Sequence, residues 1–327
     1  MKKILVFSNR EQIGDGIIKL PFIYELKIRF PNSKIIWATN SGKTVYNNLI
    51  KNIASQYIDE FYETVPLLSF LLRRKNTNYN LNQKFDIVID TQKAVIRSLA
   101  IRFLKSDIFI SSAANWIFSD VKPEKKINKL KDNYYLNDLF FMLDLISQKK
   151  EKNNFVLNIP NKLQNEVNKL FNKDSKYFAY SPGSATKERI WKIENFIQVA
   201  IHFSNLNFIP TFFLGPLEKD LKDFISRKIP NAFFPEDEIK SFSGPEVVMA
   251  ASKNIECSLA NDSGTSHMLS IGTKYLVKII GPSSSKFTSK KENFHIIDSN
   301  DFGTKNVNII KPDFVINYIE KNILKKN

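Results

Sequence analysis

The chain has 327 residues, of which 43% are hydrophobic and 25% are charged, so it can bury a large core as an ordinary globular protein does. Its 48 Lys and Arg outnumber its 33 Asp and Glu, and the formal net charge is +15. The lysines are nevertheless spread along the chain without a nucleic-acid-binding motif, and no apolar run reaches the roughly 18 residues of a membrane-spanning helix, which argues against both of those protein classes.

The N-terminal half alternates apolar and amphipathic segments. KILVFS (3–8) is expected to be a buried strand rather than part of a signal peptide, since its apolar run is short and lacks a cleavage site of small residues. A glycine-bearing loop follows, and then an amphipathic helix over about 17–29 that ends before Pro31. Further strands are expected at 34–39, 85–90 and 107–111. This alternation predicts a parallel sheet covered by helices.

The middle of the chain is polar and basic. Residues 119–133 are followed by a helix expected over about 134–147, and then by a charged break at 148–154. We therefore place a domain boundary between 150 and 175 and predict domains of residues 1–160 and 161–327.

The C-terminal half restarts the pattern. Strands are expected at 177–181, 208–215, 231–235, 255–260 and 275–281. A closing helix over about 312–325 could pack on either domain. The prediction is an α/β protein with two Rossmann-like, doubly wound parallel-sheet domains that face each other across a cleft. Such domains bind ligands at the carboxyl ends of their strands.

The chain has one cysteine, Cys257, so no disulfide can form within it. This usage fits a reducing cytoplasm, and we expect Cys257 to be a small core residue.

NSGKT (40–44) resembles the end of a nucleotide-binding P-loop. That motif requires a glycine five residues before Gly42, where Trp37 stands instead. We therefore reject a P-loop and expect Lys43 and Thr44 to begin a helix.

QIGDGIIKLP (12–21) follows the first expected strand. Gly14 and Gly16 flank Asp15, so the backbone could bend sharply and approach a ligand closely. The segment lacks GxGxxG, which argues against a dinucleotide cofactor. Two interpretations of Asp15 stay open: it caps the next helix, or it is a general base at the carboxyl end of a strand.

SPGSATKERIW (181–191) follows the first strand of the second domain. Gly183 permits a tight turn, Ser184 offers a hydroxyl near an expected helix start, and Lys187 and Arg189 offer cations. Thr186 offers a second hydroxyl. These groups are what a phosphate or diphosphate site needs. The alternative is an ordinary basic first turn, although cations there oppose the helix dipole.

ANDSGTSHM (260–268) places an acid, hydroxyls and a histidine between a strand and a helix. Ser266 and His267 are adjacent, and GTSHM does not match the GxSxG motif of a serine hydrolase. The turn Asp262-Ser263-Gly264 could instead present backbone N–H groups to an anion. His267 either donates to the same anion or makes a structural hydrogen bond.

Together these loops resemble the heptosyltransferase family, glycosyltransferase family 9, which has the GT-B fold. The resemblance rests on GD-x(5)-P at 14–21, PG…W at 182–191, DSG-x-x-H at 262–267 and a strand that ends in Gly281 and Pro282. Members of that family transfer heptose from ADP-heptose to the inner core of lipopolysaccharide, and the match covers most of the chain.

The resemblance implies that Asp15 is the catalytic base of a single displacement that inverts the anomeric configuration. Ser184 would touch the donor diphosphate, and Glu218 stands where the family has an acid near the ribose or base. Arg189 takes the place of a usual lysine, and Lys192 that of a usual proline. The implied donor site comprises Gly183, Ser184, Thr186, Lys187, Arg189, Glu218, Asp262, Ser263, Gly264 and His267.

The resemblance further implies an ADP-sugar donor, no obligatory metal, and a lipid-linked saccharide acceptor at the cytoplasmic face of the inner membrane. VPLLSFLLRRK (65–75) is either a peripheral contact with anionic lipid or a buried helix with a solvated end. Two other readings stay open: a GT-B sugar-nucleotide epimerase, and a noncatalytic relative that binds nucleotide sugars.

Overall fold

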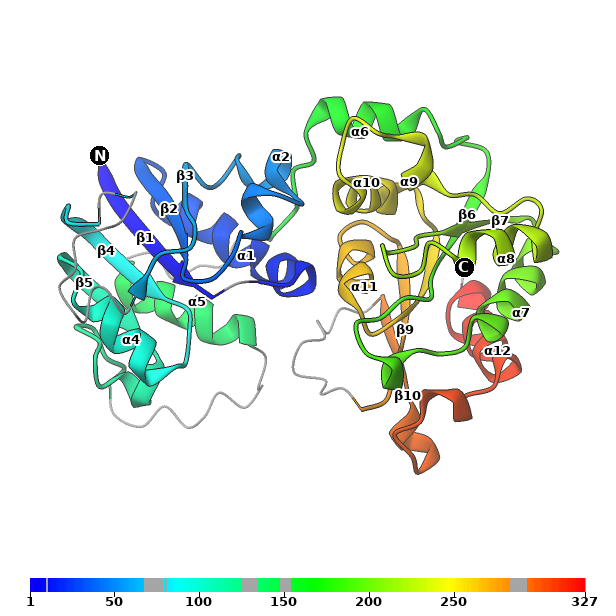
Figure 1. Cartoon of the computed structure of the whole chain (residues 1–327). Coiled ribbons are helices and arrows are strands. Elements are labelled where there is room, and N and C mark those ends of the chain that lie inside the picture. Colours follow the sequence, from blue (N-terminus) through cyan, green and yellow to red (C-terminus); the bar gives the residue numbers. More distant parts are fainter. Residues whose placement is uncertain are drawn as a thin grey trace. The chain divides into compact units, whose positions relative to one another are not determined.

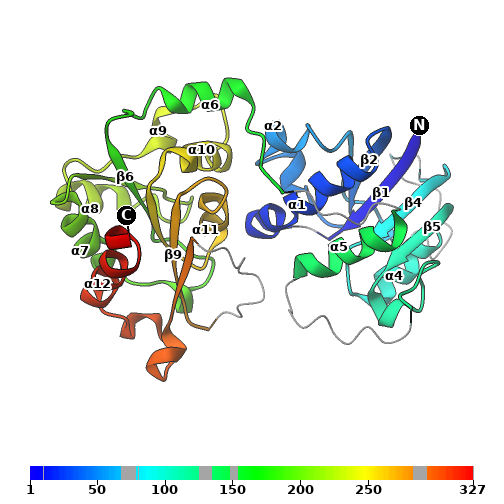
Figure 2. The same ribbon diagram turned by 180° about the vertical axis from the view of Figure 1, so that it is seen from behind.

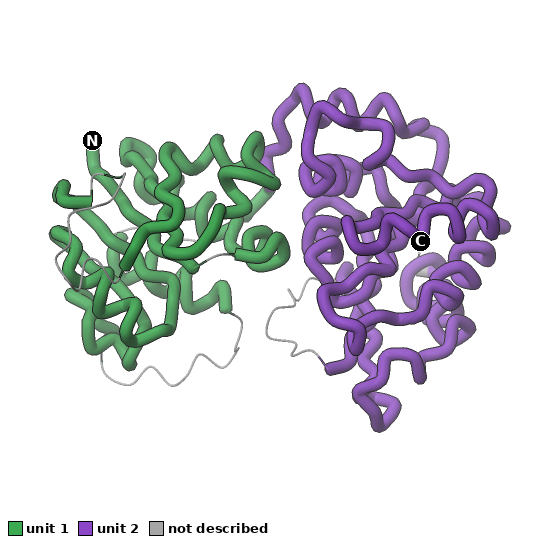
Figure 3. The backbone as a smooth tube through the Cα atoms, in the orientation of Figure 1, with its two compact units in different colours: residues 1–156 green, residues 157–327 purple. Residues whose placement is uncertain are grey.

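The computed structural model describes residues 1–9, 11–67, 79, 81–124, 135–147, 154–282 and 293–326. The chain forms two compact units, unit 1 (Met1–Val156) and unit 2 (Leu157–Asn327) (Figure 3). The division thus falls at Val156, where residue 160 was expected. In the described part of the chain, no helix is both long and apolar enough to cross a bilayer.

Unit 1 is built on a five-stranded parallel sheet in the order β3-β2-β1-β4-β5. Its strands are β1 (Lys2–Ser8), β2 (Ser33–Thr39), β3 (Glu60–Tyr62), β4 (Phe85–Asp90) and β5 (Ser106–Ser111). Ile4, Leu5, Val6 and Phe7 of the central strand are all fully buried. Apolar side chains on both faces of a strand are typical of a sheet covered by helices on both sides.

Helices cover both faces of this sheet (Figures 1 and 2). The unit contains α1 (Ile13–Arg29), α2 (Lys51–Ala54), α4 (Val95–Arg102), α5 (Tyr135–Ile146) and the 3-10 turns η1 (Val45–Asn47) and η2 (Ala113–Trp116). Helix α1 contacts α5. Helix α4 packs Ala100 and Ile101 in the same cluster as Leu5 and Phe7 of β1.

Unit 2 has a second five-stranded parallel sheet, in the order β10-β9-β8-β6-β7. Its strands are β6 (Lys176–Ser181), β7 (Phe208–Phe212), β8 (Cys257–Asn261), β9 (Tyr275–Ile280) and β10 (Phe294–Asp298). The chain adds β7 on one side of β6 and then β8 on the other, so the strand order reverses between β6 and β8. Ligands of doubly wound sheets bind at the carboxyl end of such a switch point.

The helices of unit 2 also lie on both faces of their sheet (Figures 1 and 2). They are α6 (Asn161–Asn168), α7 (Ile193–Ser204), α8 (Leu221–Lys228), α9 (Pro235–Glu238), α10 (Gly244–Ala251), α11 (Gly264–Leu269) and α12 (Pro312–Asn322), with 3-10 turns η3 (Lys187–Arg189), η4 (Ser252–Asn254), η6 (Ser299–Phe302), η7 (Val307–Ile309) and η8 (Leu324–Lys326). The closing helix α12 contacts α7 of its own unit. Cys257 is fully buried in the core, as expected.

The prediction of a glycine-bearing loop before α1 is wrong. The helix begins at Ile13, four residues before the expected position 17, so Gly14, Asp15 and Gly16 lie in its first turn. An acid in a first turn is favoured by the helix dipole. Gly16 is needed for packing rather than for a bend, because a Cβ there would lie 2.5 Å from Cγ2 of Val45.

Two further expectations differ from the structure. Residues 231–235 form no strand; Thr211 and Phe233 make an isolated bridge, and Pro235 instead begins α9. Proline has no backbone N–H for a ladder and suits the first turn of a helix. The helix expected at Lys43 and Thr44 is the single 3-10 turn η1, and the Thr44 side chain caps it by accepting from Tyr46 N.

Candidate functional site

The switch point of unit 2 brings two of the singled-out loops together. Strands β6 and β8 are neighbours, with Ser181 paired to Ala260, so the loops that follow them start side by side. The Ser184 hydroxyl donates to the backbone oxygen of Asp262 at 3.1 Å. Two residues 78 positions apart in the sequence, each expected to bind a donor diphosphate, therefore touch.

Asn261, the last residue of β8, links both ends of the 182–191 loop. Its Nδ2 donates to the Pro182 oxygen at 2.6 Å, and its Oδ1 accepts from Trp191 N at 3.2 Å. The Trp191 side chain is fully buried and donates from Nε1 to the Ile310 oxygen. The sequence analysis quoted Asn261 without assigning it a role. The signal that could have identified Asn261 is its position as a polar residue at the end of an apolar strand.

The Asp262 carboxylate lies between two cations. Arg189 Nη1 is 3.7 Å from Oδ2, and Lys278 Nζ is 3.2 Å from Oδ1. The Lys278 side chain is only 3% exposed, whereas that of Arg189 is 40% exposed. Burial lowers the pKa of Lys278, and the charge of Asp262 opposes that effect. With two cations and one carboxylate, this trio carries a net positive charge beside the loop.

Lys278 was missed in the sequence, although a signal was present. It stands in YLVKIIG, a strand whose other residues are mostly apolar. A lysine in a buried strand is rare and needs a partner, and Asp262 on the neighbouring loop supplies it.

Helix α11 carries Gly264 as its first residue and His267 one turn in. Ser263 is its N-cap: its hydroxyl accepts from Ser266 N, while the Ser266 hydroxyl reaches back to Ser263 N. The pKa of His267 is lowered to about 3 by burial and by Lys278, with Asp262 opposing. The imidazole is therefore neutral at pH 7 and has one N–H to donate.

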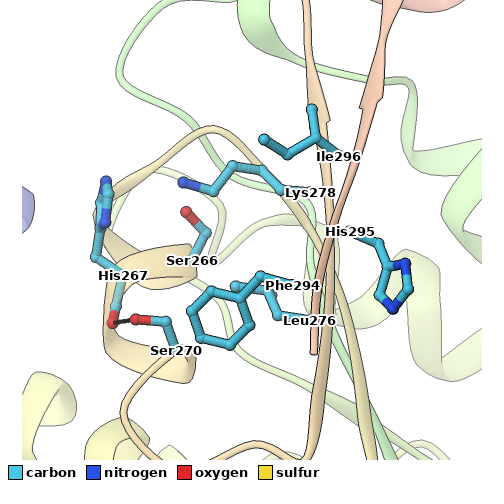
Figure 4. Close-up of a pocket in the computed structure, with 8 residues that line it drawn as sticks. All are labelled: Ser266, His267, Ser270, Leu276, Lys278, Phe294, His295 and Ile296. Atoms are coloured by element: carbon cyan, nitrogen blue, oxygen red, sulfur yellow. Dashed lines mark hydrogen bonds between the residues drawn. The ribbon is translucent and has the colours of Figure 1, made fainter. Parts of the chain in front are cut away.

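A small, open pocket lies beside this helix (Figure 4). Ser266 and His267 of α11 and Lys278 of β9 supply polar groups, while Leu276 and Phe294 of the sheet form an apolar part of the wall. The His295 ring lies on the opposite side of β10, where Nδ1 is 3.2 Å from the Tyr318 hydroxyl. The pocket thus combines hydrogen-bonding groups with an aromatic surface.

Glu218 lies against both glycines of the adjoining loops. A Cβ at Gly183 would be 2.5 Å from Cδ of Glu218, and one at Gly215 would be 2.6 Å from Oε2. Burial raises the pKa of Glu218, and hydrogen bonds from backbone N–H groups, including that of Ser184, oppose this. The two glycines therefore make room for a carboxylate next to the 182–191 loop.

Thr186 and Lys187 are exposed on the same loop. The helix start expected near Ser184 and Thr186 is wrong, because only the 3-10 turn η3 forms there and α7 begins at Ile193. Any anion at Ser184 must therefore be held by side chains and loop N–H groups, without the dipole of a long helix.

In unit 1, Asp15 is exposed on the first turn of α1, one turn before the buried Lys19. Lys19 Nζ donates to Ser8 Oγ at 2.7 Å and lies 3.9 Å from Glu11 Oε1. Glu11 also accepts from Trp37 Nε1 at 2.9 Å. Burial lowers the pKa of Lys19, whereas the charges of Glu11 and Asp15 raise it. A buried ion pair thus lies where β1 ends.

Four neighbouring strands of unit 1 are each followed by a buried polar atom that lacks a hydrogen-bond partner in the described structure. These atoms are Asn9 Oδ1, Asn40 Oδ1, Gln92 Nε2 and Ser112 Oγ. Leaving such an atom unpaired costs about 1–3 kcal/mol, so each one calls for a water or a ligand. Their common position marks the carboxyl edge of this sheet as a candidate polar binding site.

The sequence matches no protein-family model and no curated protein. Solved structures do resemble it. A glycosyl transferase family 9 protein from Veillonella parvula superposes with a TM-score of 0.74 at 18% identity, over 99% of this chain and 97% of that one. E. coli heptosyltransferase WaaC, solved with ADP-2-deoxy-2-fluoro heptose, gives a TM-score of 0.70 at 13% identity, covering 98% and 99%. E. coli ADP-heptose lps heptosyltransferase II gives 0.66 at 13%, covering 100% and 99%.

The chain has the GT-B fold. The prediction of two Rossmann-like parallel-sheet units is confirmed, since each five-stranded sheet has a doubly wound order. The predicted cleft between the two units stays a prediction.

Within this GT-B chain, unit 2 gathers most of the predicted donor residues around one switch point. Residues that share contacts there are Gly183, Ser184, Arg189, Glu218 and Asp262. Ser263, Gly264 and His267 follow on α11, whereas Thr186 and Lys187 are exposed nearby. Gly14, Asp15 and Gly16 belong to unit 1.

Two predictions about partners stay untested. Of the segment 65–75, residues 68–75 lie outside the described residues. Across the described ranges, no group of three or more His, Cys, Asp or Glu side chains could hold a metal ion. The expectation that no metal is required remains a prediction.

Proposed function

We propose that the protein is a family 9 glycosyltransferase that moves a sugar, heptose in the first instance, from an ADP-sugar to a saccharide acceptor. The observation that carries the proposal is the trio of Arg189, Lys278 and Asp262 beside Ser184, at the switch point of unit 2. A net positive, partly buried pair of loops suits a diphosphate.

The nature of the donor is supported by two further features. The Glu218 carboxylate next to Ser184 suits the hydroxyls of a ribose. The surface beside His267 offers polar groups and the Phe294 ring, and this combination suits contact with a sugar. Two of the similar structures carry ADP-heptose or its analogue in their names, which makes ADP the first nucleotide to test.

In the proposed reaction, Asp15 takes the proton from an acceptor hydroxyl while that oxygen attacks the anomeric carbon. The bond from that carbon to the diphosphate breaks, and ADP leaves with the electron pair. Attack opposite the leaving group inverts the configuration in one step. Arg189 and the neutral His267 would donate to the departing diphosphate, whose charge grows in the transition state. No metal is invoked.

We propose a lipid-linked saccharide as the acceptor, of the kind found in a lipopolysaccharide core or a related surface glycan, bound at the cytoplasmic face of a membrane. The unpaired atoms at the edge of unit 1 support a hydroxyl-rich ligand, because they include both acceptors (Asn9, Asn40) and donors (Gln92, Ser112). Hydroxyl groups can satisfy both kinds, whereas a phosphate cannot donate to the amide oxygens.

The test is calorimetric titration of the purified protein with ADP, UDP, GDP and CDP. Selective binding of ADP is expected, and Arg189→Ala should weaken it about 10- to 100-fold by removing a charge-assisted contact. Lys173→Ala, which removes an exposed cation elsewhere in unit 2, is the matched control. Selective binding of UDP or GDP would contradict the ADP-sugar donor, and no binding of any nucleotide would contradict the transferase.

With the nucleotide established, Asp15→Asn tests the catalytic base. Turnover should fall about 10²- to 10⁴-fold, the usual contribution of a general base. ADP affinity should not change, since Asp15 lies in unit 1. Turnover at the wild-type rate would rule out Asp15 as the base.

A further inference from the structure

Helix α4 of unit 1 has an apolar stripe that faces solvent. Val95, Leu99 and Phe103 follow one another at intervals of four residues, and Ile96 lies beside them. Phe103 is 63% exposed and Ile96 is 70% exposed. The opposite side of the helix is apolar as well, because Ala100 and Ile101 pack on the sheet. The α4 stripe (Val95, Ile96, Leu99, Phe103) therefore does not contribute to the core of unit 1.

The turn η2 contacts α4. Ile117, which ends this turn, is 65% exposed. Single exposed apolar side chains are ordinary on a protein surface, whereas a group of them on adjacent elements marks a contact surface. The α4 stripe is such a group, and Ile117 adds an exposed apolar side chain at the end of the turn that contacts α4.

The stripe is flanked by cations. Residues 91–106 include Lys93, Arg97, Arg102 and Lys105 but no carboxylate. Lys93 pairs with Asp138 and Arg102 with Asp120, while Arg97 donates to Gln92 Oε1 at 3.5 Å. The Lys105 side chain is exposed. Asp138 and Asp120 neutralise two of these four cations, so Arg97 and Lys105 supply the net positive charge around the stripe. The partner of this surface should therefore be apolar inside and anionic around it.

We infer that the α4 stripe docks the protein on an anionic lipid bilayer. The apolar side chains would enter the boundary between headgroups and acyl chains, and the surrounding cations would lie at the level of the lipid phosphates. A second copy of the chain fits less well. A two-fold interface would bring the same patch, and hence the same basic rim, from both copies together.

The position of the stripe suits the proposed acceptor. Helix α4 begins five residues after β4 ends, so it belongs to the same carboxyl edge of unit 1 as Gln92 and Thr91. Docking there would hold unit 1 at the surface from which a lipid-linked saccharide projects. This purpose rests on the proposed function, but docking itself is measured without donor or acceptor.

The experiment is co-sedimentation of the full chain with vesicles of phosphatidylcholine alone and of equal parts phosphatidylcholine and phosphatidylglycerol. The chain should bind only the anionic vesicles. Ile96→Ser combined with Phe103→Ser should lower the partition coefficient at least about tenfold, since two large apolar side chains no longer leave water. Val156→Ser combined with Leu206→Ser, two exposed apolar residues on other elements, should change little.

A second variant tests the charges. Arg97→Gln combined with Lys105→Gln should lower binding to anionic vesicles and flatten its dependence on salt. Unchanged melting temperature and ADP binding in every variant would show that fold and donor site are intact. The inference is overturned if wild type does not bind anionic vesicles or if the Ile96/Phe103 variant binds as wild type. A dimer in solution that this variant dissociates would also overturn it, in favour of self-association.

Discussion

Lys19 and Lys278 are buried lysines that each lie near the carboxyl edge of a sheet. Each has a carboxylate within reach: Glu11 at 3.9 Å from Lys19, and Asp262 at 3.2 Å from Lys278. Burying a charge is unfavourable unless a partner compensates it, and breaking such a pair is more costly than never having formed it. We therefore expect each buried lysine to have a role in ligand binding at the carboxyl edge of its sheet.

For Lys278 the reason can be tested with Lys278→Met. Without this cation, Arg189 becomes the main partner of Asp262 and is less available to a bound phosphate. We expect ADP to bind about tenfold more weakly in calorimetry, because one charge interaction is lost. Lys274→Met removes an exposed lysine at the start of the same strand, paired with Glu256, and should leave the affinity unchanged. Equal affinities of the Lys278 variant and wild type would contradict this role.

Asp90 makes the stability of unit 1 depend on pH. Its carboxylate is fully buried and accepts from Ser98, Ser111 and the backbone of Gln92. Burial nevertheless raises its pKa from 3.8 to about 6. The folded state therefore binds the proton more tightly than the unfolded state. The stability that this group contributes is present below the unfolded pKa and is lost as pH rises to about 6.

The prediction concerns Asp90→Asn, which cannot ionise. Relative to wild type, its free energy of unfolding should rise by about 2 kcal/mol between about pH 4 and about pH 7.5. Urea unfolding of both proteins at the two pH values measures this difference. The contributions of the other carboxylates to the free energy of unfolding are the same in both proteins and cancel. A difference that does not vary with pH would show that Asp90 is not the responsible group.

At the scale of elements, continuous apolar runs predicted the central strands well. FDIVID became β4 with the expected bounds, because a strand between two others is apolar on both faces. Of the four edge strands, β5 and β7 were expected, whereas β3 and β10 were missed. Each pairs on one side only, and EFY and FHIID lack a fully buried run. These two strands form because they pair with a neighbouring strand, and their own residues do not indicate that pairing.

The residues of the candidate site also fall into two groups, those that could be predicted from the sequence and those that were missed. Ser184, Arg189 and Asp262 could be predicted because each stands in a loop after a strand, where local residue types indicate anion binding. Asn261 and Lys278 act across strands that are distant in sequence, so their partners appear only in the folded sheet. The start of α1 was misjudged because two glycines favour a loop locally, whereas both lie in the first turn of the helix, where Gly16 leaves room for Val45.

Helix α1 offers a test of this packing. Gly16→Ala should destabilise the protein by about 1–3 kcal/mol through overpacking. The higher helix propensity of alanine offsets about 1 kcal/mol of this loss. Val45→Ala removes the methyl group that a Cβ at position 16 would strike at 2.5 Å. In chemical denaturation, Gly16→Ala should therefore cost less in the Val45→Ala background than in wild type. Equal costs in both backgrounds would mean that the contact is not responsible.

At the scale of the molecule, all described residues of the proposed donor site lie in unit 2, which has its own sheet and core. We therefore predict that residues 157–327 fold alone and bind ADP with nearly the affinity of the full chain. Circular dichroism and calorimetry of this fragment measure both properties. A folded fragment that fails to bind ADP would show that unit 1 contributes part of the nucleotide site.

The single cysteine has a practical consequence for following such a two-unit protein. Cys257 is fully buried in β8, and burial raises the pKa of its thiol far above the usual range, so little thiolate is available to react. Cysteines introduced at exposed positions, such as Lys51 in unit 1 and Lys228 in unit 2, would take maleimide probes while the native thiol remains silent. The chain can thus be labelled at two chosen points, and energy transfer between the labels would report domain motion as nucleotide is added.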